Sequence, residues 1–327
     1  MTIARALWTI APGIAELRLE TLSARAPDQV LARMLASGIS RGTERLVLAG
    51  KVPENQWGVM RCPLQAGDFP FPVKYGYSAV AHVAEGPAEL QGKRVFCLHP
   101  HQDIFLAPAA MCVPVPDAVP DHRAVLGANM ETALNILWDA RPLPGERALV
   151  IGAGVVGLLV AYLLARIPAM AVTIIDPDTS RRAIAEALGI TFAAPEAAPA
   201  EQELIIHASA NPAGLRQALQ CAAFEARIIE ASWFGAQEVA LPLGEAFHSR
   251  RLRLISSQVG AVAPSMRARR SYGERMAQAL GLLADPALEA LVGPATPFQD
   301  LPQALHDLLN PAPGQPSPLC PLVTYGA

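Results

Sequence analysis

The sequence lacks the cysteine pairs that build disulfide frameworks and structural zinc clusters. Its five cysteines are scattered, at Cys62, Cys97, Cys112, Cys221 and Cys320, and no C-x-x-C pair occurs. Disulfide-rich secreted domains and structural zinc sites are both built from closely spaced cysteines. We therefore expect reduced thiols, a cytoplasmic protein and no structural zinc.

An excess of basic charge is also missing. The chain of 327 residues has 26 Lys and Arg against 29 Asp and Glu, which gives a formal net charge of −3. Dedicated nucleic-acid-binding proteins usually carry a clear basic excess. We therefore expect no nucleic-acid partner.

The chain has little that could cross or enter a membrane. Residues 148–165 are uncharged, and hydropathy alone would allow them to span a bilayer. Glycines divide this run into a short strand, a turn and a helix, which a spanning helix would not need. The N-terminal stretch has too short an apolar core for a signal peptide and soon meets Pro12-Gly13. We expect no membrane partner.

A glycine-rich turn lies at the centre of what the chain does contain. Ala148–Ile151 is a short apolar run typical of a buried parallel strand, and an apolar helical pattern follows it. A second β-branched run, Val172–Ile175, ends at an acid, Asp176. Between strand and helix stands the G-x-G-x-x-G pattern, formed by Gly152, Gly154, Val155, Val156 and Gly157.

This context gives each glycine a physical role. Gly152 permits the tight turn, Gly154 lets backbone N–H groups approach a pyrophosphate, and Gly157 lets the helix pack closely on the strand. The start of the helix, with Val155 and Val156, supplies partial positive charge to the phosphates. The pattern predicts a dinucleotide site. The alternative is a turn of the same shape that binds nothing.

Asp176 bears on the choice of cofactor. A carboxylate that closes the second strand accepts hydrogen bonds from ribose hydroxyls and repels a 2′-phosphate. This favours NAD(H) over NADP(H). Arg181 is a candidate cofactor contact, although Arg181 and Arg182 could equally lie over the adenine or in solvent.

The pattern of elements divides the chain into three parts. Residues 1–125 read as a β-rich domain, because short strand candidates alternate with Pro, Gly and polar turns. Residues 126–260 alternate strand and helix, which is typical of a doubly wound parallel sheet. Residues 261–327 return to the style of the first part. The predicted strands are Ala4–Thr9, Glu16–Leu22, Gln29–Ser37, Ala79–Ala84, Arg94–Leu98, Ala148–Ile151, Val172–Ile175, Leu204–Ala208, Arg227–Glu230, Arg253–Ser256 and Pro321–Tyr325.

Helices are predicted between these strands. Ser180 is the expected N-cap of a helix over Arg181–Leu188, and Asn211 followed by Pro212 is expected to open the next helix. The remaining predicted helices cover Asp121–Trp138, Pro264–Leu283 and Leu301–Leu309.

A β-rich first part, a central doubly wound part and a return to the first style resemble the medium-chain dehydrogenase/reductase superfamily, in which zinc-type alcohol dehydrogenases are found. Three local segments support this. Ser37–Glu44 (S-G-I-S-R-G-T-E) resembles the family's G-I-C-G-T-D segment, and Tyr75–Ser78 with the strand after it resembles its G-H-E segment. Ala128–Thr132 resembles the C-A-G-x-T helix start beside the nicotinamide. The run G-I-S-x-G-T-E-R-L is similar to bacteriochlorophyllide dehydrogenases. The resemblance implies an α/β fold: a GroES-like catalytic domain, a Rossmann domain and a C-terminal return.

The family's zinc ligands are replaced in this chain. The positions of its Cys, His, Glu and second Cys ligands read Ser40, Tyr77, Ser78 and Ala128. No thiolate or imidazole is left to bind zinc, so we expect none. His99 and His101 lie nearby, and without further ligands we expect them to be surface or core histidines.

Without zinc, side chains must stabilise the developing oxyanion and supply a proton. The resemblance places Tyr77 where the ligand His would be, so Tyr77 is the candidate donor, assisted by Ser40 and Thr43. Tyr77 could instead only fill the vacant metal site. Glu44 matches the Asp of the family's G-I-C-G-T-D segment, which supports the zinc ligands without binding the metal itself. The alternative to a catalytic role for Glu44 is a structural one. Arg41 is a candidate for binding the cofactor's pyrophosphate. The segment has one residue more than the family's motif, so the alignment of Arg41 with that motif is open.

Three further features complete the candidate site. Thr132 lies where the family's helix packs beside the nicotinamide, and Ser257 ends the last expected Rossmann strand near the nicotinamide amide. Seven arginines crowd Arg250–Arg275, and Arg267 and Arg270 are expected to share a helix face. They could bind a carboxylate or phosphate of the substrate, or form a solvated face or a dimer contact.

These observations predict a zinc-independent oxidoreductase that prefers NAD(H) and acts on a small organic alcohol or carbonyl. The alternatives are an enone or quinone C=C reductase of the same superfamily, or a dinucleotide-binding protein without turnover. A homodimer is expected from the family resemblance.

Overall fold

The chain is described from a computed structural model, in which residues 2–312 and 318–326 are placed. It divides into two compact units. One combines residues 1–128 with 276–327, and the other is Asn129–Arg275. The sequence predicted changes of domain after residues 125 and 260.

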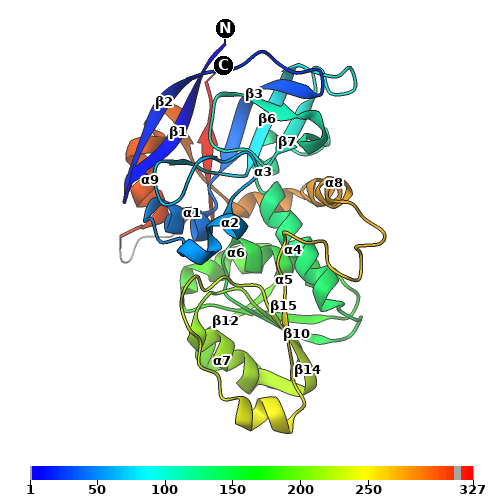
Figure 1. The fold of residues 1–327 in the computed structure, drawn as a ribbon. Coiled ribbons are helices and arrows are strands. Elements are labelled where there is room, and N and C mark those ends of the chain that lie inside the picture. Colours follow the sequence, from blue (N-terminus) through cyan, green and yellow to red (C-terminus); the bar gives the residue numbers. More distant parts are fainter. Residues whose placement is uncertain (1, 313–317, 327) are drawn as a thin grey trace. The chain divides into compact units, whose positions relative to one another are not determined.

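The first unit contains two sheets among its described residues (Figure 1). The smaller sheet has the order β2-β1-β5-β4 and is led by the antiparallel pair β1 and β2. In the larger sheet the order is β16-β17-β3-β6-β7-β9, with β8 paired to β3. The strands are β1 Ile3–Ala11, β2 Ile14–Thr21, β3 Gln29–Gly38, β4 Ala66–Gly67, β5 Val73–Lys74, β6 Ala79–Glu85, β7 Arg94–Cys97, β8 Ile104–Pro108, β9 Val113–Pro114, β16 Val292–Pro297 and β17 Cys320–Thr324.

Helices of this unit are short, and α1 and α9 contribute buried leucines to the core. The α-helices are α1 Arg41–Leu48, α2 Trp57–Met60, α3 Asp121–Ala124 and α9 Leu301–Leu309, and short 3-10 helices cover Glu54–Gln56, Ala109–Met111, Pro286–Leu291 and Phe298–Asp300. The core between α1, α9 and the strands contains Ile39, Leu48, Leu305 and Val323, all at most 3% exposed.

The second unit is built on one parallel sheet (Figure 1). Over its described residues the strand order is β12-β11-β10-β13-β14-β15, the doubly wound arrangement. The strands are β10 Arg147–Ile151, β11 Ala171–Ile175, β12 Thr191–Ala193, β13 Gln202–His207, β14 Ala222–Glu230 and β15 Arg253–Ser256. The helices are α5 Val155–Leu164, α6 Arg182–Ala187 and α7 Pro212–Cys221, with 3-10 turns at Thr179–Arg181 and Pro195–Ala197 and a π-turn at Leu243–Phe247.

Helices α4, Gly127–Ala140, and α8, Tyr272–Leu282, each run across a change of unit.

Register in this sheet brings the strand ends together. Ile151 pairs with Ile175 on one side and with His207 on the other, His207 pairs with Glu230, and Glu230 pairs with Ser256. These residues end their strands at one edge, the carboxyl edge. In open α/β sheets ligands bind at that edge.

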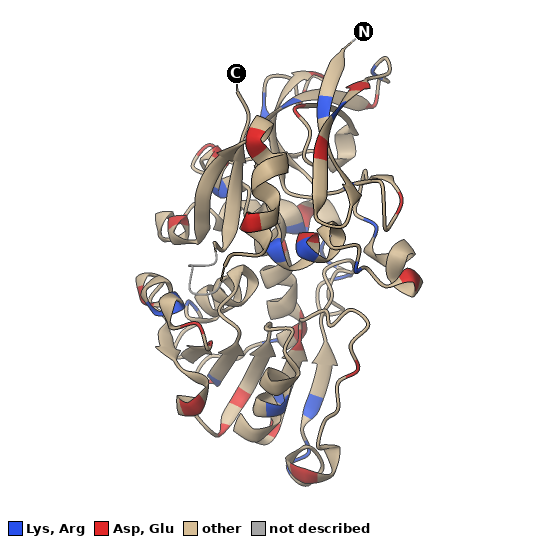
Figure 2. Cartoon of the chain, turned by 90° about the vertical axis from the view of Figure 1, so that its left-hand side faces the viewer, with Lys and Arg blue, Asp and Glu red and all other residues tan. Residues whose placement is uncertain are grey.

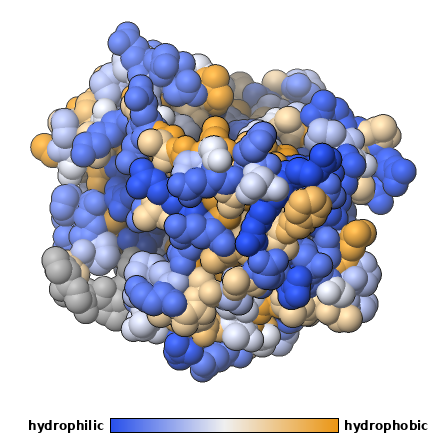
Figure 3. Space-filling view, turned by 90° about the horizontal axis from the view of Figure 1, so that it is seen from below, coloured by the Kyte–Doolittle hydropathy of each residue, from blue (hydrophilic) through white to orange (hydrophobic). Residues whose placement is uncertain are grey.

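Apolar side chains fill both faces of this sheet. Leu149, Ile205 and Ile228 are fully buried in one cluster with α7. Helix α5 is buried from Gly157 to Leu164, because it packs on the sheet. This explains the uncharged run over residues 148–165: it is a core strand and a core helix. Of the helices in the described part of the chain, none combines the length and apolar character that a membrane span requires. The face in Figure 3 mixes hydrophilic and hydrophobic residues.

Most predicted strands are confirmed, and two helices are corrected. The helix expected over Asp121–Trp138 is two helices, α3 and α4, separated by Val125 and Leu126. The helix expected over Pro264–Leu283 begins only at Tyr272. Residues before it form turns, in which Met266 and Arg267 both donate to the Ala263 carbonyl. Arg267 and Arg270 therefore do not share a helix face.

One predicted cap is corrected and one is confirmed. The N-cap before the 3-10 turn Thr179–Arg181 is Asp178 and not Ser180, because the Asp178 side chain accepts from the Ser180 N–H at 3.1 Å. The cap at Asn211 is confirmed, because its side chain accepts from the Ala213 N–H at 2.9 Å.

All five cysteines are free and buried.

Candidate active site

The glycine turn joins β10 to α5 at the carboxyl edge of the parallel sheet. Gly152 has φ +106°, a conformation open to glycine, and a Cβ there would lie 2.9 Å from the Ser209 backbone. A Cβ at Gly157 would lie 1.9 Å from the Gly152 carbonyl oxygen, so the helix approaches the turn too closely for any side chain. Nothing lies within 4 Å of a Cβ at Gly154. Gly152 and Gly157 thus allow close packing, and Gly154 leaves open space at the start of the helix.

Asp176 follows β11 and faces the same turn. Its carboxylate accepts from the Ala153 N–H at 2.7 Å and from the Asp178 N–H at 2.8 Å. Each carboxylate oxygen can accept more than one hydrogen bond, so the partly exposed group keeps acceptor capacity for ribose hydroxyls.

The arginines after Asp176 contact protein groups. Arg181 is 8% exposed and its Nε lies 3.2 Å from the Asp178 carboxylate. Arg182 lies over the Phe192 ring, 4.9 Å from its centroid, and donates to the Phe192 carbonyl at 3.1 Å.

Tyr77, Ser40 and Thr43 come together in the first unit. Ser40 is the N-cap of α1, and Tyr77 lies in the loop between β5 and β6. The Tyr77 hydroxyl donates to Ser40 Oγ. Burial raises the pKa of Tyr77 to about 12, while hydrogen bonds with Ser40 and Thr43 oppose the rise. The phenol is therefore protonated at neutral pH. The grouping predicted from the motifs is present.

Glu44 is buried next to Ser40 and is part of a series of hydrogen bonds. One carboxylate oxygen accepts from the Ser40 N–H at 2.7 Å, and the other lies 3.1 Å from His101 Nε2. On its far side His101 Nδ1 lies 2.7 Å from Ser37 Oγ, which is 2.9 Å from the Tyr325 hydroxyl.

A carboxylate can only accept, so His101 Nε2 donates to Glu44, and in the neutral ring Nδ1 accepts from Ser37. The sequence predicted His101 only as a surface or core histidine, and no sequence motif pointed to a role for Ser37 or Tyr325. These residues come from β3, the β7–β8 loop and the C-terminal segment, and only the fold brings them together.

His99 and His101 are core residues, as expected. They are 5% and 1% exposed. His99 stacks on Phe105 with ring centroids 4.0 Å apart, and burial lowers its pKa to about 3.

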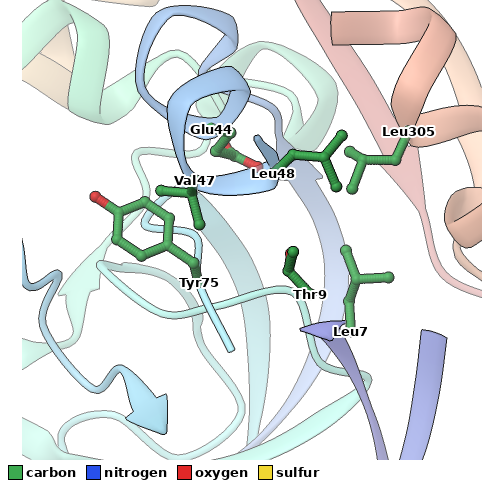
Figure 4. Close-up of a pocket in the computed structure, with 7 residues that line it drawn as sticks. All are labelled: Leu7, Thr9, Glu44, Val47, Leu48, Tyr75 and Leu305. Atoms are coloured by element: carbon green, nitrogen blue, oxygen red, sulfur yellow. The ribbon is translucent and has the colours of Figure 1, made fainter. Parts of the chain in front are cut away.

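A small pocket lies between α1 and β1 (Figure 4). Glu44, Val47 and Leu48 of α1 line it with Leu7 and Thr9 of β1, Tyr75 and Leu305. Its lining is mostly apolar, so it belongs to the packing of α1 on β1.

Ser257 and Arg41 contact protein groups in this structure. The Ser257 hydroxyl donates to Asp139 at 2.6 Å. The Arg41 guanidinium donates to the carbonyls of Leu308 at 3.1 Å and Pro318 at 3.0 Å. Thr132 lies partly exposed on α4. The cofactor roles predicted for these three residues remain predictions.

The arginines over Arg250–Arg275 do not converge on one point. Arg250 pairs with Glu201 at 2.7 Å and Arg251 with Glu225 at 2.8 Å. Arg275 is 2% exposed and holds Glu131 at 3.0 Å. Basic and acidic residues are interspersed along the ribbon in Figure 2. The anion pocket remains a prediction.

Comparison with known proteins places these features in a family context. No family model matches the chain. An L-threonine 3-dehydrogenase of Rhizobium rhizogenes is 38% identical over 87 residues, 25% of this chain and 24% of that protein. A zinc-type alcohol dehydrogenase-like protein of Haemophilus influenzae, uncharacterized, is 25% identical over 221 residues, 63% of this chain. The matches span 24% and 60% of these relatives' lengths.

Solved structures match over the whole chain. A protein of Sinorhizobium meliloti bound to NADP superposes with a TM-score of 0.79 at 16% identity, covering 99% of this chain and 100% of that one. A short chain alcohol dehydrogenase of Escherichia coli complexed with NADH gives the same values.

The chain has the medium-chain dehydrogenase/reductase fold. The α/β class, the β-rich GroES-like part and the parallel Rossmann sheet predicted from the sequence are confirmed.

The residues that the sequence resemblance places at zinc-ligand positions make other contacts in the structure. Ser40 and Tyr77 are hydrogen-bonded to each other, and the Ser78 hydroxyl donates to the Val125 carbonyl. Ala128, 6% exposed, offers only a methyl group. Zinc in proteins is held by thiolates, imidazoles and carboxylates. Among residues 2–312 and 318–326, no group of three or more His, Cys, Asp or Glu could hold a metal ion.

Proposed function

We propose that this protein is a zinc-independent oxidoreductase that prefers NAD(H) and interconverts a small organic alcohol and its carbonyl. The hydrogen-bonded pair of Tyr77 and Ser40 at zinc-ligand positions carries the proposal. The nicotinamide-bound neighbours support the cofactor class, and the dehydrogenase relatives support the reaction class.

The Rossmann unit would hold the dinucleotide at its carboxyl edge. Gly154 and the first turn of α5 would face the diphosphate, and Asp176 would accept from the adenosine ribose. A 2′-phosphate at that point would meet the carboxylate, and Arg181 and Arg182 are engaged by Asp178 and Phe192. These contacts favour NAD(H). When bound, the cofactor supplies or removes the hydride.

Tyr77 would supply the proton for carbonyl reduction. Its raised pKa, about 12, keeps the hydroxyl protonated at neutral pH. A protonated phenol can donate a hydrogen bond to the carbonyl oxygen and transfer its proton as negative charge develops there. Ser40 accepts the phenol's hydrogen bond, and Thr43 also hydrogen-bonds to the phenol. Once the phenol's proton has moved to the substrate, both hydroxyls would donate to the phenolate oxygen and stabilise its charge.

Glu44 would act through Ser40 rather than on the substrate. Its carboxylate fixes the Ser40 backbone N–H and the start of α1, and His101 fixes the carboxylate. We also propose that the partner is a small-molecule substrate, that the protein binds neither nucleic acid nor membrane, and that it forms a homodimer. Light scattering of the purified chain tests the dimer.

Cofactor fluorescence followed by a substrate panel tests the function. We expect NADH to bind more tightly than NADPH, and at least one aldehyde or ketone in the panel to be reduced. An enone in the panel distinguishes the rival reaction, since C=C reduction also requires no metal. Saturation of the C=C bond with the carbonyl intact would replace the proposed reaction with the rival. Tight NADH binding with no turnover of any panel member would contradict catalysis.

A further inference from the structure

A serine, a histidine and a glutamate lie in line at the carboxyl edge of the Rossmann sheet. His207 ends β13, and Glu230, its partner in the parallel register, ends β14. Ser209 follows His207 by two residues. His207 Nδ1 lies 2.7 Å from Glu230 Oε2, and His207 Nε2 lies 2.7 Å from Ser209 Oγ. None of these residues is used by the proposed dehydrogenase chemistry.

Hydrogen bonding fixes the proton positions in this group. Glu230 accepts from the Ser232 N–H at 2.7 Å with its other oxygen, Oε1, as a carboxylate would. A carboxylate can only accept, so Nδ1 of His207 donates to Glu230, and in the neutral ring Nε2 is then the acceptor. The Ser209 hydroxyl donates to Nε2 of that neutral ring. This is the tautomer in which a histidine can remove a proton from a serine.

Burial and packing hold the histidine in place. Its side chain is 0% exposed, and the Glu230 side chain is 15% exposed. Phe234 stacks on the imidazole at 17° between planes, with centroids 5.9 Å apart. Ser209, in contrast, is partly exposed. The base and its carboxylate are shielded while the nucleophile reaches the surface.

Space beside the serine hydroxyl is kept free by glycine. A Cβ at Gly214 would lie 2.7 Å from Ser209 Oγ and 2.9 Å from His207 Nε2. The Ser209 backbone also contacts the glycine turn, where a Cβ at Gly152 would lie 2.9 Å away. The first turn of α5 follows that turn. Its N–H groups lack intrahelical partners and favour negative charge nearby.

We propose that Ser209, His207 and Glu230 form a second site, which transfers acyl groups from small esters. Ser209 Oγ attacks the ester carbonyl carbon, and its proton passes to His207 Nε2. The C–O bond to the alcohol breaks, and the leaving oxygen takes the proton from Nε2. Water then attacks the acyl-serine, gives a proton to Nε2, and releases the acid as Ser209 regains its proton. Glu230 is a positioning residue that holds the tautomer.

A fluorophosphonate probe tests the site on the full chain without added nucleotide, because such probes react with activated serines. We expect a single adduct, which mass spectrometry of peptides assigns to Ser209, and a burst of p-nitrophenol from p-nitrophenyl acetate. Ser209→Ala should lose both. Glu230→Gln should slow labelling about 10-fold or more, because the wrong tautomer is then allowed, and Glu230→Asp should recover part of the rate.

Ser249→Ala is the matched control, since Ser249 is an exposed serine that bonds only to the Glu245 carbonyl at 3.1 Å. It should label at the wild-type rate. No adduct on Ser209 of the wild-type chain would overturn the proposal. So would wild-type labelling rates in Glu230→Gln, because a merely reactive surface serine needs no carboxylate. Circular dichroism of each variant confirms that the fold is kept.

Discussion

Tyr77 differs from a metal-binding residue in the chemistry that its side chain can supply. A histidine can bind zinc, which polarises a carbonyl without supplying a proton. The phenol instead carries its own proton, and its pKa of about 12 keeps that proton in place at neutral pH. The side chain suits the direction in which a carbonyl is reduced.

Replacement of Tyr77 by Phe tests this role. We expect kcat/KM for carbonyl reduction to fall about 100-fold or more, the range typical of a lost general acid, with NADH affinity unchanged. Tyr75→Phe is the control, because the Tyr75 hydroxyl only donates to the Met60 carbonyl at 3.3 Å. Equal rates for wild type and Tyr77→Phe in steady-state assays would assign Tyr77 to packing.

Asp176 determines cofactor preference in this account. Asp176→Ala removes the carboxylate that would repel a 2′-phosphate, so the ratio of NADPH to NADH affinity should rise about 10-fold or more, since a charge-assisted contact is worth about 1.5 to 3 kcal/mol. Fluorescence titration with both nucleotides measures it. Asp300→Ala, an exposed acid in the other unit, should leave the ratio as it is. The same ratio in Asp176→Ala and wild type would remove this residue from the cofactor site.

At the scale of elements, the glycines of the turn between β10 and α5 have different roles: Gly157 allows close packing, and Gly154 is the proposed contact of the cofactor. A Cβ at Gly157 would lie 1.9 Å from the Gly152 carbonyl, so Gly157→Ala should push the helix from the sheet and lower the melting temperature. Gly154 has open space, so Gly154→Ala should melt within a few degrees of wild type but bind NADH more weakly, because the methyl group would occupy the diphosphate's place. Thermal melting and NADH titration of both variants check this. A Gly154→Ala chain with wild-type affinity would move the diphosphate elsewhere.

The sequence predicted helices and strands well where the hydrophobic period and the flanking Gly or Pro residues indicated the same bounds. β15, Arg253–Ser256, and α9, Leu301–Leu309, have the predicted bounds. The three-residue strand β12 was not predicted, because so short a run between Gly189 and Pro195 has no visible period. The helix over Pro264–Leu283 was wrong in its first half. Arg275 holds the preceding loop in place by donating to the carbonyls of Val259 and Ala261, a tertiary effect that sequence periodicity does not encode.

The candidate site residues divide in the same way, into those that local sequence predicts and those that only the fold brings together. The glycines and Asp176 lie within one strand–turn–helix–strand segment, so local spacing was enough to predict them. His101 and Glu44 are 57 positions apart, and His207 and Glu230 are 23 apart and meet only through parallel register. A signal existed for the second pair, since Glu230 ends one predicted strand and His207 is the last residue but one of another. Using it required knowing that the strands are neighbours.

Across the whole molecule, buried acids make the fold sensitive to alkaline pH. Burial raises the pKa of Cys62 and of Cys320 from 9.0 to about 12, and that of Tyr77 from 10.0 to about 12. The unfolded chain loses these protons first, so their contribution to stability is complete below about pH 9 and is lost as pH rises toward 12. A tenfold difference in proton affinity between folded and unfolded states is worth about 1.4 kcal/mol.

We therefore expect the free energy of unfolding in urea to fall between about pH 9 and pH 11. Cys320→Ala should show a flatter decline over that range, although its stability at pH 7 will be lower because a buried side chain is cut back. Equal unfolding free energies at pH 7 and pH 10.5 for the wild-type chain would contradict the burial of these groups.

The central claim is that the protein transfers hydride without zinc. It is tested most directly by elemental analysis and turnover of the same sample before and after treatment with a strong zinc chelator. We predict no stoichiometric zinc in the purified chain and an NADH-dependent reduction rate that the chelator leaves unchanged. Stoichiometric zinc, with activity that is lost on chelation and restored by added zinc, would contradict the account.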